Sequence, residues 1–258
     1  MCTNGDQQSP ITLAFPSQIP KYFKSADTKN DPLKAAKMIN SMSRESFQII
    51  AHMSNPDRAI EFEFSQKIHK NGLICEKYVC HFDAAEHKIH DGDEVFAECQ
   101  LICYKNTYDN YDDALFSSTK SAIQIFSVRY ELGTPTQDNK KSTNKLIKAM
   151  STGRDGEFNF PKISEEADSY WRYDGSVTTP TCEEVVTWTI FVNTVSVDSR
   201  QIEKIRSLIS GNDVESVKTN RELQKINRRE IQCVIFENHE RSLKSTTIRN
   251  FRVIFDLK

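Results

Sequence analysis

Imidazole side chains are the groups in this chain best suited to bind a metal or to transfer protons near neutral pH. The sequence holds six of them, at His52, His69, His81, His87, His90 and His239. The spacing H-x-H, which would place two imidazoles on one face of a strand, does not occur. His87 and His90 fall in the charged stretch HKIHDGDE and are predicted to be surface residues. A metal site built from His81, His87 and His90 would need a rebuilt loop.

The seven cysteines offer a second kind of chemistry, as metal thiolates or as disulfides. Cys75 and Cys80 enclose four residues, and Cys99 and Cys103 enclose three. No CxxC pair and no second matched half follows, so a zinc knuckle is not indicated. From the spacing alone, we expect free thiols scattered through the core.

The stretch SVTTPTC, residues 176–182, places two threonines, a proline and a cysteine directly before an apolar strand. Threonine hydroxyls in such a turn can satisfy backbone groups at the entry to a buried strand. On its residues alone, this structural role explains the turn.

Strand signals dominate the elements that must position these groups. AIEFEF (59–64) alternates apolar and charged residues, which is the pattern of a half-buried strand. β-Branched and aromatic runs predict five further strands, over 95–104, 122–132, 185–192, 231–236 and 248–257. Apolar stripes predict two helices, over 142–150 and 198–209, and Asp198 with Gln201 fits a capping box for the second. The sequence thus predicts a mainly β protein with one large sheet and peripheral helices.

The bulk composition indicates a single domain over 1–258, because 8 glycines and 8 prolines leave no flexible linker. Charged residues make up 27% and the formal net charge is −2, so bulk attraction to nucleic acid or to an anionic membrane is not predicted. No apolar run reaches the length of about 18 residues that a transmembrane helix needs. The first residues, MCTNGDQQSPI, lack the apolar segment of a signal peptide.

Residues 170–209 contain the motifs YWRYDGSVTTP (170–180) and EVVTW (184–188). These motifs resemble the patterns Y-W-x-Y-x-G-S-L-T-T-P and E-x-V-x-W of the α-class carbonic anhydrases. A second match is QSPI at 8–11, which corresponds to Q-S-P-[IV] near the family's N-terminus. The resemblance implies the carbonic anhydrase fold, with a central, twisted and mostly antiparallel sheet of roughly ten strands and short helices outside it.

The resemblance also implies a zinc ion held by three histidines, two from an H-x-H strand segment and one from the neighbouring strand. An open fourth position holds a water whose pKa the metal lowers to about 7 in this family. YVCHFDAAEH (78–87) and AECQLICY (97–104) occupy these two strands. The ligand positions are then Val79, His81 and Gln100, of which Val79 cannot coordinate and Gln100 is a weak oxygen donor. We therefore expect that the zinc site is lost.

Four further residues are assigned by the resemblance to a vestigial pocket without a catalytic role. Thr178 matches the threonine that orients the zinc-bound hydroxide, with Thr179 beside it, and Glu86 matches its carboxylate partner. Arg58 falls near the position of the proton-shuttle histidine. A guanidinium stays charged near neutral pH and cannot relay protons.

Secreted and membrane-anchored family members carry a disulfide between a cysteine before Q-S-P-I and one after T-T-P-x. Cys2 and Cys182 hold these places, so the resemblance predicts that they pair in an oxidising compartment. Cys80 and Cys99, on neighbouring strands and facing away from the metal position, could form a second bridge, although the family does not predict one. The alternative is free thiols in a cytosolic protein.

The sequence therefore predicts a catalytically inactive carbonic anhydrase-related domain without a cofactor, secreted or part of an ectodomain. It would act by binding an unidentified protein or another extracellular ligand. The alternative is an active zinc carbonic anhydrase that hydrates carbon dioxide with an unusual ligand set. A cytoplasmic location is the alternative to secretion.

Overall fold

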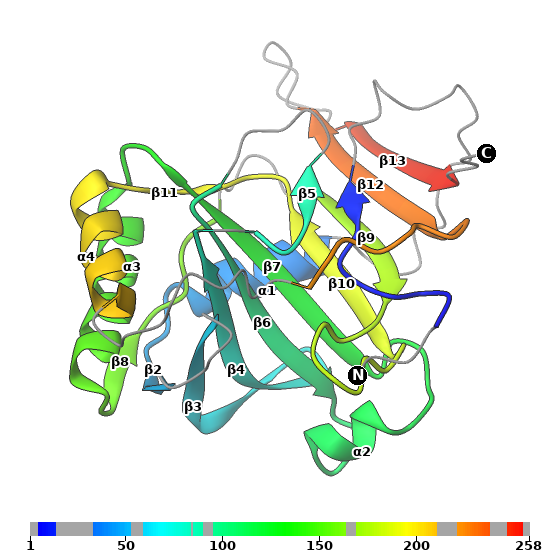
Figure 1. Ribbon diagram of the computed structural model, residues 1–258, viewed down its shortest axis with the longest axis horizontal. Helices are drawn as coiled ribbons and strands as arrows, with labels where there is room; N and C mark the ends of the chain where they lie inside the picture. The colour runs from blue at the N-terminus through cyan, green and yellow to red at the C-terminus, as the bar shows by residue number, and fades with distance from the viewer. Residues whose placement is uncertain are drawn as a thin grey trace.

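The computed structural model describes residues 5–13, 33–52, 59–83, 85–89, 95–163, 169–210, 221–237 and 247–254. Side chains are described in these ranges except in 33–36, 234–237 and 247–254. One large twisted sheet dominates the fold, and the helices lie at its periphery (Figure 1).

Eleven strands of the described residues form this sheet. Ten follow the order β13–β12–β9–β10–β7–β6–β4–β3–β2–β8, and β11 pairs with β7. The bounds are β2 Phe47–His52, β3 Ala59–Lys70, β4 Leu73–Phe82, β6 Ala97–Lys105, β7 Ile123–Leu132, β8 Gly156–Phe158, β9 Tyr170–Gly175, β10 Val186–Phe191, β11 Val195–Val197, β12 Glu230–Glu237 and β13 Thr247–Ile254. Neighbours are antiparallel, except that β10 and β11 both run parallel to β7. The prediction of a mainly β fold with a large, mostly antiparallel sheet is confirmed.

A second, two-stranded sheet pairs β1 (Thr12–Leu13) in parallel with β5 (Lys88–Ile89). It lies beside β9 and β10 in the view of Figure 1. Both Leu13 and Ile89 are buried, so this small sheet packs the N-terminal segment onto the main body.

Burial along the strands follows the sequence patterns that predicted them. In β3, Ile60 and Phe62 are buried while Glu63 is exposed, as the alternation in AIEFEF requires. β10 is instead buried at every position, because it lies inside the sheet between β9 and β7 with both faces covered. All six predicted strands are present. β3 continues six residues past its predicted end (70 minus 64), and the ends of the other five differ by at most three residues.

Both predicted helices are present, as α3 (Gln137–Thr152) and α4 (Ser199–Ser210), and they lie side by side at one end of the sheet (Figure 1). The capping box is reciprocal, because Gln201 N donates to Asp198 Oδ1 at 2.9 Å and Asp198 N donates to Gln201 Oε1 at 3.3 Å. α3 begins five residues before its predicted start (142 minus 137), since its first turn is polar and carries no apolar stripe. The helices α1 (Leu33–Met42) and α2 (Tyr111–Leu115) were not predicted.

β4 and β6 lie next to each other and separate two chemical environments. Cys80 and Cys99 belong to the larger cluster of buried apolar side chains. Because side chains alternate along a strand, their neighbours Val79, His81 and Gln100 point to the opposite face of the sheet. The candidate site lies on that face.

Candidate functional site

Two adjacent strands bring together the residues at the predicted ligand positions. Val79 on β4 is directly paired with Gln100 on β6, and His81 is paired with Glu98. Directly opposed residues of an antiparallel ladder have Cβ atoms about 4.5–5.5 Å apart. The structure therefore places Val79, His81 and Gln100 on one small patch of the sheet.

The carboxylate of Glu86 lies against this patch. Gln100 Nε2 donates a hydrogen bond of 2.8 Å to Glu86 Oε2, and His81 Nε2 lies 3.7 Å from Glu86 Oε1. Glu86 is 4% exposed and Gln100 3% exposed, so the carboxylate depends on these neighbours for stabilisation. His81 is also buried, and its Nδ1 has no hydrogen-bond partner within the described ranges.

His87 is buried at 2% exposure, and the prediction that it is a surface residue is wrong. Its Nδ1 lies 2.8 Å from Glu98 Oε1, and its Nε2 lies 2.6 Å from the Tyr173 hydroxyl. Both ring nitrogens therefore have protein partners, which leaves neither for the alternative metal site with His81 and His90. His90 lies outside the described residues. The charged residues that suggested a surface loop follow His87 in the sequence, and Asp91, Asp93 and Glu94 among them lie outside the described residues.

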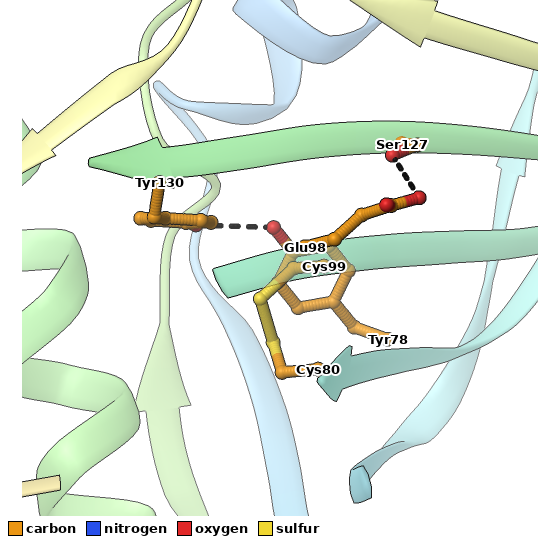
Figure 2. The surroundings of a disulfide bond; sticks show 6 residues. All are labelled: Tyr78, Cys80, Glu98, Cys99, Ser127 and Tyr130. Atoms are coloured by element: carbon orange, nitrogen blue, oxygen red, sulfur yellow. Dashed lines mark hydrogen bonds between the residues drawn. A yellow bond between two sulfur atoms is a disulfide. The ribbon is translucent and has the colours of Figure 1, made fainter. Parts of the chain in front are cut away.

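Glu98 is the centre of a buried polar network, which was not predicted from the sequence. It is fully buried, and it also accepts hydrogen bonds from the backbone N–H of His87 at 2.9 Å and from Ser127 Oγ at 2.7 Å, the latter drawn in Figure 2. Burial alone would raise its pKa, but the charge and hydrogen bonds of His87, with the Ser127 hydroxyl, outweigh burial and lower the pKa to about 2. An acidic residue inside a mostly apolar strand was the available signal.

The two sequence motifs that carry the family resemblance contact each other. Ser9 of QSPI donates its N–H to Ser176 Oγ at 3.0 Å, and its own Oγ accepts from Ser176 N at 3.1 Å. Tyr173 extends the His87 network to the same residue, because its hydroxyl donates to Ser9 Oγ at 3.1 Å. A Cβ at Gly175 would lie 2.2 Å from Ser9 Oγ, so this close approach requires glycine.

The turn that follows has a defined backbone structure. Cys182 N donates to Thr179 O at 2.9 Å, and Val177 N donates to Glu183 O at 3.1 Å. Thr178 is half-buried and Thr179 is exposed. Within the described residues, no hydrogen bond joins the Thr178 hydroxyl to Glu86, and the assignment of these residues to a vestigial pocket stays a prediction. Arg58 lies outside the described residues.

The cysteines are largely paired, and the expectation of scattered free thiols is wrong. Cys80–Cys99 forms the bridge that the strand positions suggested, and Cys75–Cys103 forms another that was not predicted. Cys182 is also disulfide-bonded, while its predicted partner Cys2 lies outside the described residues. Of the described cysteines, only Cys233 is free, and it is buried.

Comparison with known proteins covers most of the chain. The profile of the family described as eukaryotic-type carbonic anhydrase matches residues 1–235. The chain belongs to the eukaryotic-type carbonic anhydrase family. It is 31% identical to carbonic anhydrase 3 of Bos taurus over 133 residues, which are 49% of this chain and 48% of that protein. It is 28% identical to carbonic anhydrase 1 of Oryctolagus cuniculus over 229 residues, which are 82% of this chain and 90% of that protein. The match to the first of these relatives thus spans about half of its length.

The zinc ion that the carbonic anhydrase family implies does not fit the donor atoms of this patch. Of the three ligand positions, only His81 carries an imidazole, and the Val79 side chain has no lone pair to donate. The Gln100 amide directs its nitrogen toward Glu86, and an amide oxygen is a poor zinc ligand compared with imidazole. A zinc site of this kind needs three protein ligands, so the predicted ligand positions do not supply a complete set.

None of the described helices combines the length and the apolar character that crossing a membrane requires.

Proposed function

We propose that this chain is a catalytically inactive carbonic anhydrase-like domain that acts by binding a protein or another extracellular ligand. One observation supports this proposal more than any other. Val79 and Gln100, which occupy two of the three ligand positions, are paired directly across β4 and β6. A hydrocarbon side chain and an amide thus face each other where the family has imidazoles.

The contacts of Gln100 strengthen the argument. Its amide nitrogen donates to the buried Glu86 carboxylate at 2.8 Å, so rotating the amide away from Glu86 would break that hydrogen bond. Breaking it would leave a buried carboxylate with less stabilisation, at a cost of about 1–3 kcal/mol. The patch is therefore organised as a hydrogen-bonded polar cluster, with Gln100 as a partner of Glu86.

The loss of catalysis follows from the chemistry that zinc supplies. Hydration of carbon dioxide needs hydroxide at neutral pH, which a bound metal provides by lowering the pKa of its water to about 7 in the family. None of the buried groups of the patch replaces this function, because a carboxylate and an imidazole cannot lower the pKa of water to that extent.

A buried hydrogen-bonded network that stabilises the fold lies beside the predicted metal position. Glu98, His87 and Tyr173 form a continuous buried network that ends at Ser9. Such a network stabilises the fold, and none of its side chains occupies a predicted zinc-ligand position. A stable carbonic anhydrase scaffold with an altered metal position suits a binding module. The disulfides are compatible with the proposed secreted or ectodomain location.

The decisive experiment measures zinc and activity on the same preparation. The protein is incubated with excess zinc, desalted without chelators, and analysed by elemental mass spectrometry beside carbonic anhydrase 1 of Oryctolagus cuniculus. We expect far less than one zinc per chain, no zinc-dependent hydration in a stopped-flow assay, and no change on His81→Ala. One zinc per chain, lost in His81→Ala and accompanied by hydration activity, would establish instead an active enzyme with an unusual ligand set.

A further inference from the structure

Two disulfides connect the same pair of strands. Cys75–Cys103 and Cys80–Cys99 both join β4 to β6, and each joins residues that are directly paired in the ladder. Figure 2 shows the Cys80–Cys99 bridge spanning the two strands beside Tyr78 and Tyr130. The two bridges therefore fix one strand pair at two places.

The strand pair contains an irregularity that makes both bridges possible. Cys75 and Cys80 are five positions apart (80 minus 75), whereas Cys103 and Cys99 are four apart (103 minus 99). In a regular ladder this mismatch would send one cysteine to the wrong face, because side chains alternate. The register shifts between Cys75 and Lys77, so Glu76 is the extra residue of a β-bulge. All four cysteines consequently belong to the same buried cluster.

The core around the bridges excludes solvent. Cys75, Cys80 and Cys103 are 0% exposed and Cys99 is 1% exposed. The hydroxyls of Tyr78 and Tyr130 form a hydrogen bond of 3.1 Å beside the Cys80–Cys99 bridge (Figure 2). Both tyrosine rings are buried. Phe158 stacks on Tyr78 with ring centroids 5.6 Å apart. Thiol–disulfide exchange requires a thiolate to reach a sulfur atom, and this packing leaves no direct approach.

We propose that the two bridges form one buried clamp that closes during folding and stays inert to reductants in the folded domain. Closing each bridge removes two protons and two electrons from a pair of thiols and transfers them to a donor disulfide, which becomes two thiols. Because this exchange must occur before the core packs around the cysteines, the domain folds in an oxidising compartment. The clamp is a permanent structural feature and not a redox switch.

The clamp also fixes the residues on the other face of the strand pair. Val79 and His81 flank Cys80, and Gln100 follows Cys99. A slip of β4 by one residue against β6 would turn Val79 and His81 toward the core. Two bridges, one on each side of the bulge, prevent such a slip. This inference does not depend on whether zinc binds to the domain.

The first test measures reduction of the folded protein. The protein is treated with dithiothreitol, with and without denaturant, then alkylated, and the labelled cysteines are identified by peptide mass spectrometry. The free, buried Cys233 serves as an internal reporter of global unfolding. We expect Cys75, Cys80, Cys99 and Cys103 to remain unlabelled without denaturant and to be labelled together with Cys233 when denaturant is present. Labelling of the four cysteines while Cys233 stays protected would show that the two disulfides are reduced through local opening of the folded domain. This result would overturn the proposal.

The second test examines folding and separates the clamp from the Cys182 disulfide. The variants C75A/C103A and C80A/C99A each lose one bridge and keep the cysteines outside the clamp, and Cys233→Ala is the control that loses none. After denaturation and reduction, each chain is refolded with oxidised glutathione or with dithiothreitol. We expect near-native recovery of the parent and of Cys233→Ala only under oxidation, and reduced recovery of both double variants. Equal recovery of parent and double variants under oxidation, with an unchanged urea midpoint, would overturn the proposal.

Discussion

The side-chain amide of Gln100 and the carboxylate of Glu86 form a buried hydrogen bond of 2.8 Å. This contact lies beside Val79, which is paired with Gln100 across the two central strands. A carbonic anhydrase would need imidazoles at both of those positions. The hydrogen bond between Gln100 and Glu86 thus lies at the predicted metal position, where substitutions can test the proposed loss of zinc.

Placing imidazoles at the other two predicted ligand positions is expected to give the domain a zinc site. The variant V79H/Q100H would place histidines at directly paired positions of β4 and β6. Position 79 lies two residues before His81 on β4, so all three imidazoles would lie on the same face of the sheet. Three neutral imidazoles on one patch meet the ligand requirement of a zinc site with an open fourth position. We expect bound zinc to rise to about one per chain, measured by elemental mass spectrometry after incubation with zinc.

The matched control for this prediction is V79H/H81A/Q100H, which keeps both new histidines and removes the original one. It should bind markedly less zinc than the double variant. If V79H/Q100H keeps the parent's circular dichroism spectrum and still binds no more zinc than the parent, the geometric interpretation of the patch is wrong.

Removing the Gln100 amide alone is expected to destabilise the domain. Gln100→Leu deprives the buried Glu86 carboxylate of its hydrogen-bond donor, which should lower the free energy of unfolding by about 1–3 kcal/mol. Urea denaturation followed by tryptophan fluorescence measures the change. Gln48→Leu, at an exposed position of β2, is the control and should change stability by no more than about 0.5 kcal/mol. Equal stability of the two variants would contradict the role of Gln100 as partner of Glu86.

The main strands were predictable because their residues carry a local signal. AIEFEF in β3 and the β-branched run of β10 have the alternation or the apolar continuity that a sheet requires. The pairing of β4 with β6 had no such signal and came from the resemblance. The capping box of Asp198 and Gln201 was predictable because both partners lie within one helical turn.

The failures share a physical cause, which is that burial and contacts between distant segments are not encoded locally. His87 is followed by charged residues, yet its ring contacts Glu98, 11 residues away, and Tyr173, 86 residues away. Cys75 and Cys103 did not suggest a bridge, because their spacing fits only with a bulge at Glu76. A bulge depends on the partner strand as much as on the bulged one.

The acid stability of the domain is expected to depend on Glu98. Its pKa is lowered to about 2 in the folded protein, against an ordinary value of 4.5. A lowered carboxyl pKa contributes stability that is complete above pH 4.5 and is lost as the pH falls from 4.5 through about 2. The contribution is on the order of 3 kcal/mol, and Glu98→Gln should remove this part of the pH dependence.

Urea denaturation at a series of pH values between 6 and about 2 measures the effect on Glu98→Gln. Glu203→Gln, on the exposed surface of α4, is the matched control and should keep the parent's pH dependence. An unchanged slope in Glu98→Gln would show that Glu98 does not hold a lowered pKa in the folded domain.

The contact between Ser9 and Tyr173 is expected to couple the N-terminal segment to β9. Ser9 Oγ accepts from both the Tyr173 hydroxyl and Ser176 N, each at 3.1 Å. Ser9→Ala therefore leaves two buried donors without this partner and should lower the free energy of unfolding by about 1–3 kcal/mol.

Tyr173→Phe removes one of the same hydrogen bonds from the other side. Because the two substitutions share an interaction, the double variant S9A/Y173F should lose less stability than the sum of the single variants, by at least about 0.5 kcal/mol. Urea denaturation of the four proteins completes this double-mutant cycle, and Ser151→Ala on the exposed end of α3 is the control for serine removal. Strict additivity of Ser9→Ala and Tyr173→Phe would mean that the buried network ends at Tyr173 and that the QSPI segment is held by its backbone contacts alone.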